Sequence, residues 1–299
     1  MSERFSCAEH SHAIGEPVYG TASQVRRWIL VEQPGPWGVD AVVDSGLPID
    51  VATRLRSVAR AAGARLLLIR RHGRSEVEQR ACFAALSAPD VRRVERFIVD
   101  DPADLLAIDW TVLRNWEPLG GEVLDDPLYL VCTNGRHDAC CARFGRPVAQ
   151  ALTAALGDQV WESSHFGGDR FAGNVVCLPD GIYYGRVTAV AAAGLIKLHQ
   201  AGRLDLDHYR GRSFNSFIAQ AAEYFVRSQH GLVAVDEVIA GAVDELGDDV
   251  FDVTVHTSTG TTLLARVAAE PAPHPQQLTC RSGHEERPPR YRLVELRPA

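Results

Sequence analysis

Residues 129–188 read YLVCTNGRHDACCARFGRPVAQALTAALGDQVWESSHFGGDRFAGNVVCLPDGIYYGRVT and contain four of the seven cysteines of the chain. The apolar run Tyr129–Val131 predicts a short buried strand that leads directly into Cys132. A polar loop then continues to Cys140 and Cys141. Because the polar residues of this stretch gather in loops, we expect a site where the strands end.

The remainder of the stretch predicts two helices and three further strands. Pro147 suits the first turn of a helix, and apolar residues at a 3.6-residue spacing continue that helix to Gly157. The elements that follow are strands at 160–164, 175–178 and 182–187 and a helix at 189–200. The predicted order is β-α-β-β-β-α, with Cys132, Cys141 and His165 at the same ends of neighbouring strands.

Length and composition describe an ordinary globular protein with more than one domain. The chain has 299 residues, of which 46% are hydrophobic and 23% charged. The net charge of −7 argues against nucleic acid as a partner, because a phosphate-binding surface needs clustered positive charge.

The ends of the chain and its cysteine count predict a cytoplasmic protein without a membrane partner. Residues 1–17 lack the apolar core of a secretory leader. The longest apolar run, 187–196, is too short to span a bilayer. Seven cysteines, an odd number, point away from a disulfide framework and towards metal or redox chemistry.

The first part of the chain repeats the same order of elements. The predicted elements are strands at 28–32, 64–70, 81–86 and 94–99, a helix at 49–62, and a closing helix at 101–108 capped by Asp100 or Asp101. We infer an α/β (α+β) fold with two thioredoxin-like units in tandem, in which only the second unit keeps the cysteines. Residues 1–20 are expected to lie over the first unit.

The segment Pro34-Gly35-Pro36-Trp37-Gly38 occupies the place of the cysteine loop in the first unit. Pro and Gly punctuation favours a rigid turn anchored by the tryptophan. The alternative is a lid or docking surface over the site of the second unit.

The pattern changes after Gly202 and predicts a small α+β appendage. Its expected elements are a helix at 214–227 and strands at 250–256, 261–267, 277–280 and 291–296. We therefore expect domains at 1–110, 111–204 and 205–299. Cys280 and His284 are interpreted as parts of a surface turn rather than as a ligand pair, because no second pair accompanies them.

Cys132, Cys141, His165 and Asp169 form the candidate metal site. Cysteine binds metal as thiolate, and a nearby helix N-terminus stabilises that negative charge. Two thiolates and one imidazole supply most of a tetrahedral set, and Asp169 is the natural fourth candidate.

The chain resembles the sucrase/ferredoxin-like family. The resemblance lies in Cys132-x8-Cys141, in HFGGDRFAGN at 165–174 and in YGRV at 184–187. It extends to Gly15-Glu16-Pro17, Gly20-Thr21-Ala22, Arg27-Trp28 and Pro34–Gly38. It implies a thioredoxin-like [2Fe–2S] ferredoxin domain.

In eukaryotic members of that family, two cysteines and both histidines of an H-x3-H motif bind the cluster. Here the resemblance implies that Cys132 and Cys141 hold one iron and that His165 binds the other. Asp169 stands where the second histidine would be. Either Asp169 is an oxygen ligand, or Cys140 or another group completes the site, or the cluster is absent; zinc is the alternative metal.

The leading functional hypothesis is an electron carrier rather than a stand-alone enzyme. Its partner would be a protein electron donor or acceptor, such as a reductase that supplies any nicotinamide or flavin, because no fingerprint for either is present. The rival is a cluster-free thioredoxin-like binding module. A hydrolase is disfavoured because neither an acid pair nor a Gly-x-Ser-x-Gly elbow is found. Disulfide exchange is disfavoured because no Cys-x-x-Cys exists.

Overall fold

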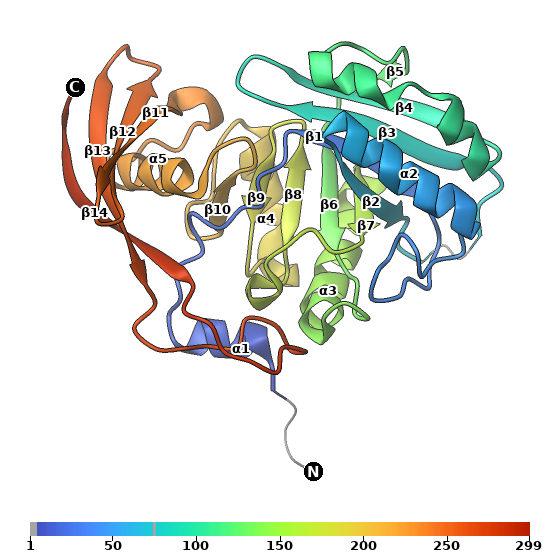
Figure 1. Ribbon diagram of the computed structural model, residues 1–299, viewed down its shortest axis with the longest axis horizontal. Coiled ribbons are helices and arrows are strands. Elements are labelled where there is room, and N and C mark those ends of the chain that lie inside the picture. The colour runs from blue at the N-terminus through green and yellow to red at the C-terminus, as the bar shows by residue number, and fades with distance from the viewer. Residues whose placement is uncertain (1–4, 74–75) are drawn as a thin grey trace.

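Two units with the same strand order share one mixed sheet (Figure 1). The structure is a computed structural model that describes residues 5–73 and 76–299. The first unit contributes β1 (Arg27–Glu32), β2 (Arg65–Arg70), β3 (Arg80–Ser87) and β4 (Arg92–Val99), with β5 (Glu122–Val123) at its edge. The second contributes β6 (Leu128–Cys132), β7 (Val160–Ser163), β8 (Val175–Leu178) and β9 (Ile182–Tyr184), with β10 (Tyr209–Arg212) at its edge.

The strand order within the sheet confirms the predicted duplication. The first unit runs β2-β1-β3-β4 and the second runs β7-β6-β8-β9. In each unit the first two strands are parallel and the other pairs are antiparallel. The units meet where β2 and β7 pair antiparallel, at Ile69 with Ser163 and at Arg70 with Glu162.

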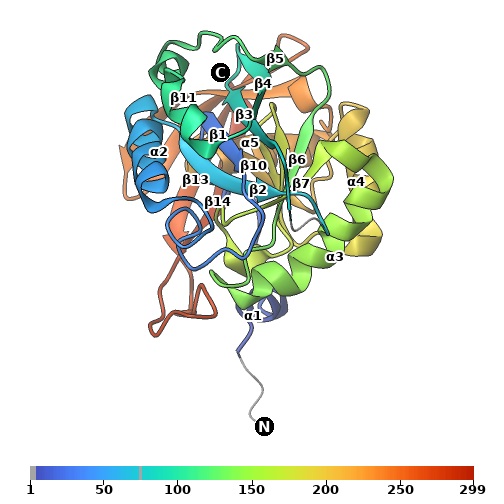
Figure 2. The same cartoon turned by 90° about the vertical axis from the view of Figure 1, so that its right-hand side faces the viewer.

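Both faces of the sheet are buried, which explains the continuous apolar runs of its strands. In β1, Trp28 and Leu30 face a core that both units share, whereas Ile29 and Val31 face α2 (Ile49–Ala62). In the second unit, α3 (Ala139–Leu156) and α4 (Ala189–Gln200) cover the outer face and lie side by side (Figure 2). Each fully buried large apolar side chain contributes roughly 1.5–3 kcal/mol.

The prediction that Pro147 opens a helix is wrong, because α3 begins well before it at Ala139. The Asp138 carboxylate caps the helix, and its Oδ1 accepts a hydrogen bond from the Cys140 amide at 2.8 Å. Pro147 therefore lies in the helix interior, where it removes one hydrogen bond of the i→i−4 series. Cys140 and Cys141 consequently belong to the first turn of α3.

The closing helix of the first unit is a 3-10 helix, η1 (Pro102–Ala107), and Asp101 is its cap as expected. A second 3-10 helix, η2 (Trp110–Asn115), follows and buries Trp110 against α2. The domain limits stay a prediction, and β5 and β10 extend the pairing of the two units past residues 110 and 204.

The C-terminal region is the expected α+β appendage. Helix α5 (Phe217–His230) packs on a sheet of β11 (Val238–Gly247), β12 (Val250–Thr257), β13 (Thr262–Pro271) and β14 (Pro289–Pro298). The sequence did not predict β10 or β11, and most of β11 is exposed and lacks an apolar pattern. The strand expected at 277–280 is wrong, since residues 272–288 form a loop between β13 and β14 whose isolated bridge pairs Gln276 with Glu286.

The N-terminal segment also differs from its prediction. Helix α1 (Cys7–Ala13) contacts η4 (Asp169–Phe171) of the second unit rather than covering the first. Residues 1–4 of the predicted segment lie outside the described part. Among the described residues, no helix combines the length and the hydropathy needed to cross a bilayer.

Candidate metal centre

Three elements of the second unit deliver the site residues. Cys132 is the last residue of β6, Cys141 lies in the first turn of α3, and His165 follows the end of β7. Because β6 and β7 are parallel and pair Cys132 with Ser163, the two strands end at the same edge of the sheet. The structure therefore confirms that Cys132, Cys141 and His165 come together, and both cysteines are buried.

The ligand atoms converge on Nδ1 of His165. This nitrogen lies 3.8 Å from Cys132 Sγ, 3.9 Å from Cys141 Sγ and 2.9 Å from Asp169 Oδ1. Cys141 donates to the same Oδ1 at 3.3 Å. Bonds of about 2.0–2.3 Å to a tetrahedral ion place its ligands about 3.3–3.8 Å apart. Cys132, Cys141 and His165 thus have the donor chemistry and nearly the spacing that a bound metal requires, and Asp169 contacts this group through His165 and Cys141.

The charges at the site favour a thiolate beside an imidazolium. Hydrogen bonding with Cys141 lowers the pKa of Cys132, and hydrogen bonding with Cys132 together with burial raises the pKa of Cys141, so Cys132 is the sulfur that favours the thiolate form. Burial lowers the pKa of His165, but the Asp169 carboxylate and the Cys132 sulfur outweigh it and raise the pKa to about 9. Burial raises the pKa of Asp169, yet hydrogen bonding and charge from His165 bring it below its usual value. Pre-formed negative charge of this kind attracts a cation.

His137 is a site residue that the sequence did not single out. Its ring stacks on that of His165 with centroids 3.8 Å apart, and its Nε2 lies 3.7 Å from Asp169 Oδ2. One third of the His137 side chain is exposed. An imidazole in the loop between the two candidate ligand cysteines was the available signal.

Cys140, considered as a substitute ligand, belongs to a different group of thiols. Its Sγ lies 3.3 Å from Cys280 Sγ and 3.3 Å from Ser6 Oγ. Cys280 and His284 do not form a ligand pair, because the His284 side chain is exposed and contacts Glu286. Cys177 is fully buried in the sheet, as expected for a packing residue.

Buried polar groups fix the Gly167-Gly168 turn that carries Asp169. Arg210 of β10 is buried, and its Nη1 donates to the Gly167 carbonyl at 3.1 Å and to Asn174 Oδ1 at 2.8 Å. Asn174 Nδ2 in turn donates to the Gly168 carbonyl at 2.7 Å. Gly168 has φ +86, and a side chain there would meet the Arg210 guanidinium. The sequence included Asn174 in its motif but gave no sign of Arg210.

The Pro34–Gly38 segment forms an anchored turn that also contacts the cysteine loop. Trp37 is buried, and its Nε1 donates to the Gln33 carbonyl at 2.8 Å. The Arg70 guanidinium lies over the Trp37 ring, 4.3 Å from its centroid. The Gly38 carbonyl accepts a hydrogen bond from Asn134 Nδ2 at 3.2 Å.

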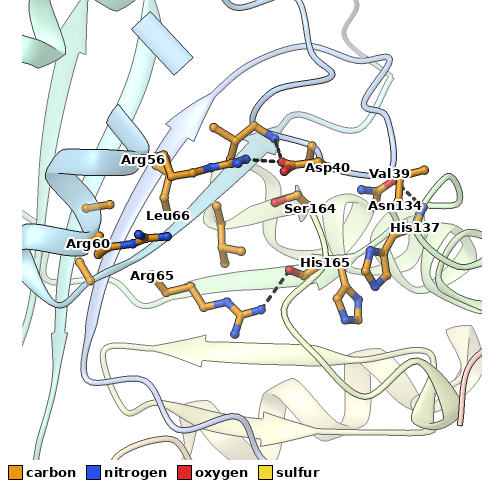
Figure 3. Close-up of a pocket in the computed structure, with 15 residues that line it drawn as sticks. Val39, Asp40, Arg56, Arg60, Arg65, Leu66, Asn134, His137, Ser164 and His165 are labelled. Carbon is orange, nitrogen blue, oxygen red and sulfur yellow. Dashed lines mark hydrogen bonds and ion pairs between the residues drawn. The ribbon is translucent and has the colours of Figure 1, made fainter. Parts of the chain in front are cut away.

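A cavity of about 620 Å³ opens beside the two histidines (Figure 3). His137 and His165 line one end of it, and Arg56, Arg60 and Arg65 line the other. Arg65 donates to the His165 carbonyl at 3.3 Å, and Arg56 pairs with Asp40. The histidine side of the group therefore faces this cavity.

The fold and the site define an α/β protein with a buried cysteine–histidine group able to hold a metal. The family model described as Sucrase/ferredoxin-like matches residues 18–211. This match covers well over half of the chain, so the protein belongs to the sucrase/ferredoxin-like family. Comparisons with curated proteins and with solved structures give no significant match.

Proposed function

We propose that this protein is an electron carrier whose [2Fe–2S] cluster is held by Cys132, Cys141, His165 and Asp169. The observation that carries the proposal is the convergence of two thiols, an imidazole and a carboxylate at one edge of the sheet, in a member of this family. A bound cluster of this type accepts and releases one electron at a time.

The residues of the chain would set the properties of the cluster. Burial of both cysteines excludes water from the sulfur side, and His165 is the ligand nearest to solvent. We expect Asp169 rather than His137 to be the fourth ligand, because Asp169 Oδ1 faces the same nitrogen as the two sulfurs. A carboxylate is a harder ligand than imidazole and would hold iron less firmly.

The cavity in front of the histidines suits a protein donor or acceptor with an acidic surface. Arg56, Arg60 and Arg65 lie at its far end, and complementary charge raises association rates. We place the carrier in the cytoplasm, because all seven cysteines are free thiols, as expected in a reducing compartment.

A single zinc ion at the same residues is the second candidate. The separations of 3.8 Å and 3.9 Å from His165 Nδ1 to the two sulfurs match one tetrahedral ion. Ligands on opposite irons of a cluster lie farther apart, so His165 would have to turn outwards towards the cavity.

The deciding experiment is anaerobic purification followed by a visible absorption spectrum and assays of iron, sulfide and zinc. The proposal expects a red-brown protein with about two irons and two sulfides per chain. A colourless protein that loses one zinc in Cys132→Ser would establish the zinc site instead. A protein without metal even after reconstitution would leave a thioredoxin-like binding module as the function.

A further inference from the structure

A second group of thiols lies on the other side of the first turn of α3. It consists of Cys7 from α1, Asp138 and Cys140 from the start of α3, and Cys280 from the loop at 272–288. One ligand atom from each residue lies within 4.8 Å of each of the others. The chain separation is large, since Cys7 and Cys280 are 273 positions apart.

The sulfurs are in contact with one another. Cys280 Sγ lies 3.3 Å from Cys140 Sγ and 3.5 Å from Cys7 Sγ. Cys7 Sγ lies 3.7 Å from both carboxylate oxygens of Asp138. A tetrahedral zinc ion with bonds of about 2.0–2.3 Å separates its ligands by about 3.3–3.8 Å. Two sulfurs bound at about 2.3 Å lie at the upper end of that range, so zinc would move the sulfurs apart by a few tenths of an ångström.

Backbone amides orient the carboxylate within this group. Asp138 Oδ1 accepts from the Cys140 amide at 2.8 Å, and Oδ2 accepts from the Cys280 amide at 2.6 Å. Each oxygen keeps a second lone pair for a metal. Asp138 is completely buried, and Cys7 and Cys140 are nearly so. Buried negative groups without a cation are unfavourable unless they are paired.

Few apolar side chains surround this second thiol group. Its buried cluster consists of Cys7, Ala8, Cys140 and Ala172. The loop at 272–288 descends from the C-terminal sheet to α1 (Figure 1). Unstructured loops of this length in compact domains usually have a function or an anchor. Cys280 is the residue of the loop that reaches the thiol group, and Arg281 Nη1 adds a bond to the Arg136 carbonyl at 2.9 Å.

We propose that Cys7, Cys140, Cys280 and Asp138 form a structural zinc site that fastens the N-terminal helix and the C-terminal loop to α3. A closed set of four protein ligands, three of them thiolates, is the arrangement of a structural rather than a catalytic zinc site. Binding releases the protons of the thiols and forms three Zn–S bonds and one Zn–O bond without any change of oxidation state. The proposal does not depend on which metal or cluster the first centre binds.

The test measures zinc in the full-length protein, purified under reducing conditions and dialysed against zinc ions. The variants are Cys280→Ser and Cys7→Ser at the proposed site and Cys132→Ser at the first centre. Cys82→Ala is the matched control, because Cys82 is a buried cysteine outside both groups. Cys280 is only partly buried, so its replacement should not prevent folding.

We expect zinc to fall by one ion per chain between the wild type and either Cys280→Ser or Cys7→Ser, and to stay unchanged in Cys82→Ala. Any visible absorbance should persist in Cys280→Ser and disappear in Cys132→Ser, which separates this site from the proposed electron carrier. X-ray absorption at the zinc edge of Cys132→Ser should show three sulfurs at about 2.3 Å and one oxygen at about 2.0 Å. Equal zinc contents in wild type and Cys280→Ser would overturn the proposal.

Mass spectrometry under non-reducing conditions tests the rival chemistry. A Cys140–Cys280 disulfide, seen as the loss of two hydrogens and a cross-linked peptide, would also overturn the zinc site.

Limited trypsin digestion provides a structural readout. Chelation should speed cleavage after Arg281 several-fold in the wild type and leave the rate in Cys280→Ser unchanged. An equal rate with and without chelator in the wild type would contradict the proposal that zinc attaches the loop at 272–288 to α3.

Discussion

The two units of the large sheet have the same strand order, but among the described residues the cysteine–histidine group that could hold a metal lies in the second unit. Their registers align residue by residue: Val31 pairs with Cys82 across β1 and β3, and Val131 pairs with Val175 across β6 and β8. Glu32 therefore occupies the place of Cys132. Its carboxylate accepts a hydrogen bond from the Ala81 amide at 2.9 Å. The first unit uses this position to hold its sheet together.

The segments that follow Glu32 in the first unit and Cys132 in the second unit also differ. After β1 the chain forms the turn anchored by Trp37, and α2 begins without a side-chain cap. After β6 the chain reaches Asp138, which caps α3 and places Cys141 beside Cys132. The difference teaches that the fold forms without cysteine ligands. We therefore expect the second unit to keep its fold when its cysteines are replaced.

The largest expected effect is the loss of the metal centre alone. Cys132→Ser and Cys141→Ser should each abolish visible absorbance and bound iron, because a hydroxyl is a poor ligand for iron, while circular dichroism stays native. Cys82→Ala, which alters a buried cysteine of the first unit, should keep full absorbance. Unfolding of Cys132→Ser would show that the cysteine is needed for the fold and would contradict the comparison.

Gly145 tests how closely the second unit is packed around Cys132. A Cβ at Gly145 would collide with the Cys132 carbonyl oxygen. We expect Gly145→Ala to lower the free energy of unfolding by about 1–3 kcal/mol, as for overpacked cores. Gly194 of α4 has open space around it, so Gly194→Ala should raise that free energy by roughly 0.5–1 kcal/mol. Urea denaturation measures the free energy of unfolding of both variants. Equal shifts in Gly145→Ala and Gly194→Ala would contradict the close packing of Gly145 against Cys132.

Asp180, in the turn between β8 and β9, is expected to make the stability of the protein depend on pH in acid. Burial raises the pKa of Asp180, but the hydrogen bond and charge of His199 and the charge of Arg92 bring it below its ordinary value. The unfolded chain thus takes up this proton at a higher pH than the folded chain. The stability from Asp180 is complete above pH about 4 and is lost as the pH falls through the lowered folded value.

Asp180→Asn should therefore flatten the dependence of unfolding free energy on pH below about 4. Asp90 occupies the corresponding turn of the first unit and is exposed, so Asp90→Asn is the matched control. Identical curves for Asp180→Asn and the wild type would mean that the ion pairs with Arg92 and His199 contribute nothing at low pH.

The smallest expected effect concerns His137. If Asp169 is the fourth ligand, His137→Phe should keep the stacked ring and leave the visible spectrum nearly unchanged. Asp169→Ala should remove most of the absorbance and of the iron. The reverse result would assign the ligand to His137, and Asp169 would then be a carboxylate that orients His165.

Most strands of the two units were predictable because both of their faces are buried and they are apolar runs, whereas β4 mixes charged and apolar residues. The start of α3 was missed because Pro147 resembles a first-turn proline, whereas Asp138 carried the true capping signal. Strand β11 was missed because its exposed residues show no alternation.

The first centre was predictable from sequence because its ligands follow the ends of parallel strands that are close in the chain. The stacking of His137 on His165 depends on loop geometry that no spacing rule fixes. The second thiol group could not be predicted from the sequence, since Cys140 and Cys280 are 140 positions apart in the chain.

Cys140 and Cys141 are consecutive residues, yet their sulfurs face different ligand groups. Successive residues on a helix point about 100° apart, so one turn of α3 serves both. Ordering of that turn by an ion on one side would lower the cost of ordering it on the other. Such linkage is reciprocal. Loading of the two groups should thus be cooperative, with chains that are empty or doubly filled outnumbering those that hold a single metal.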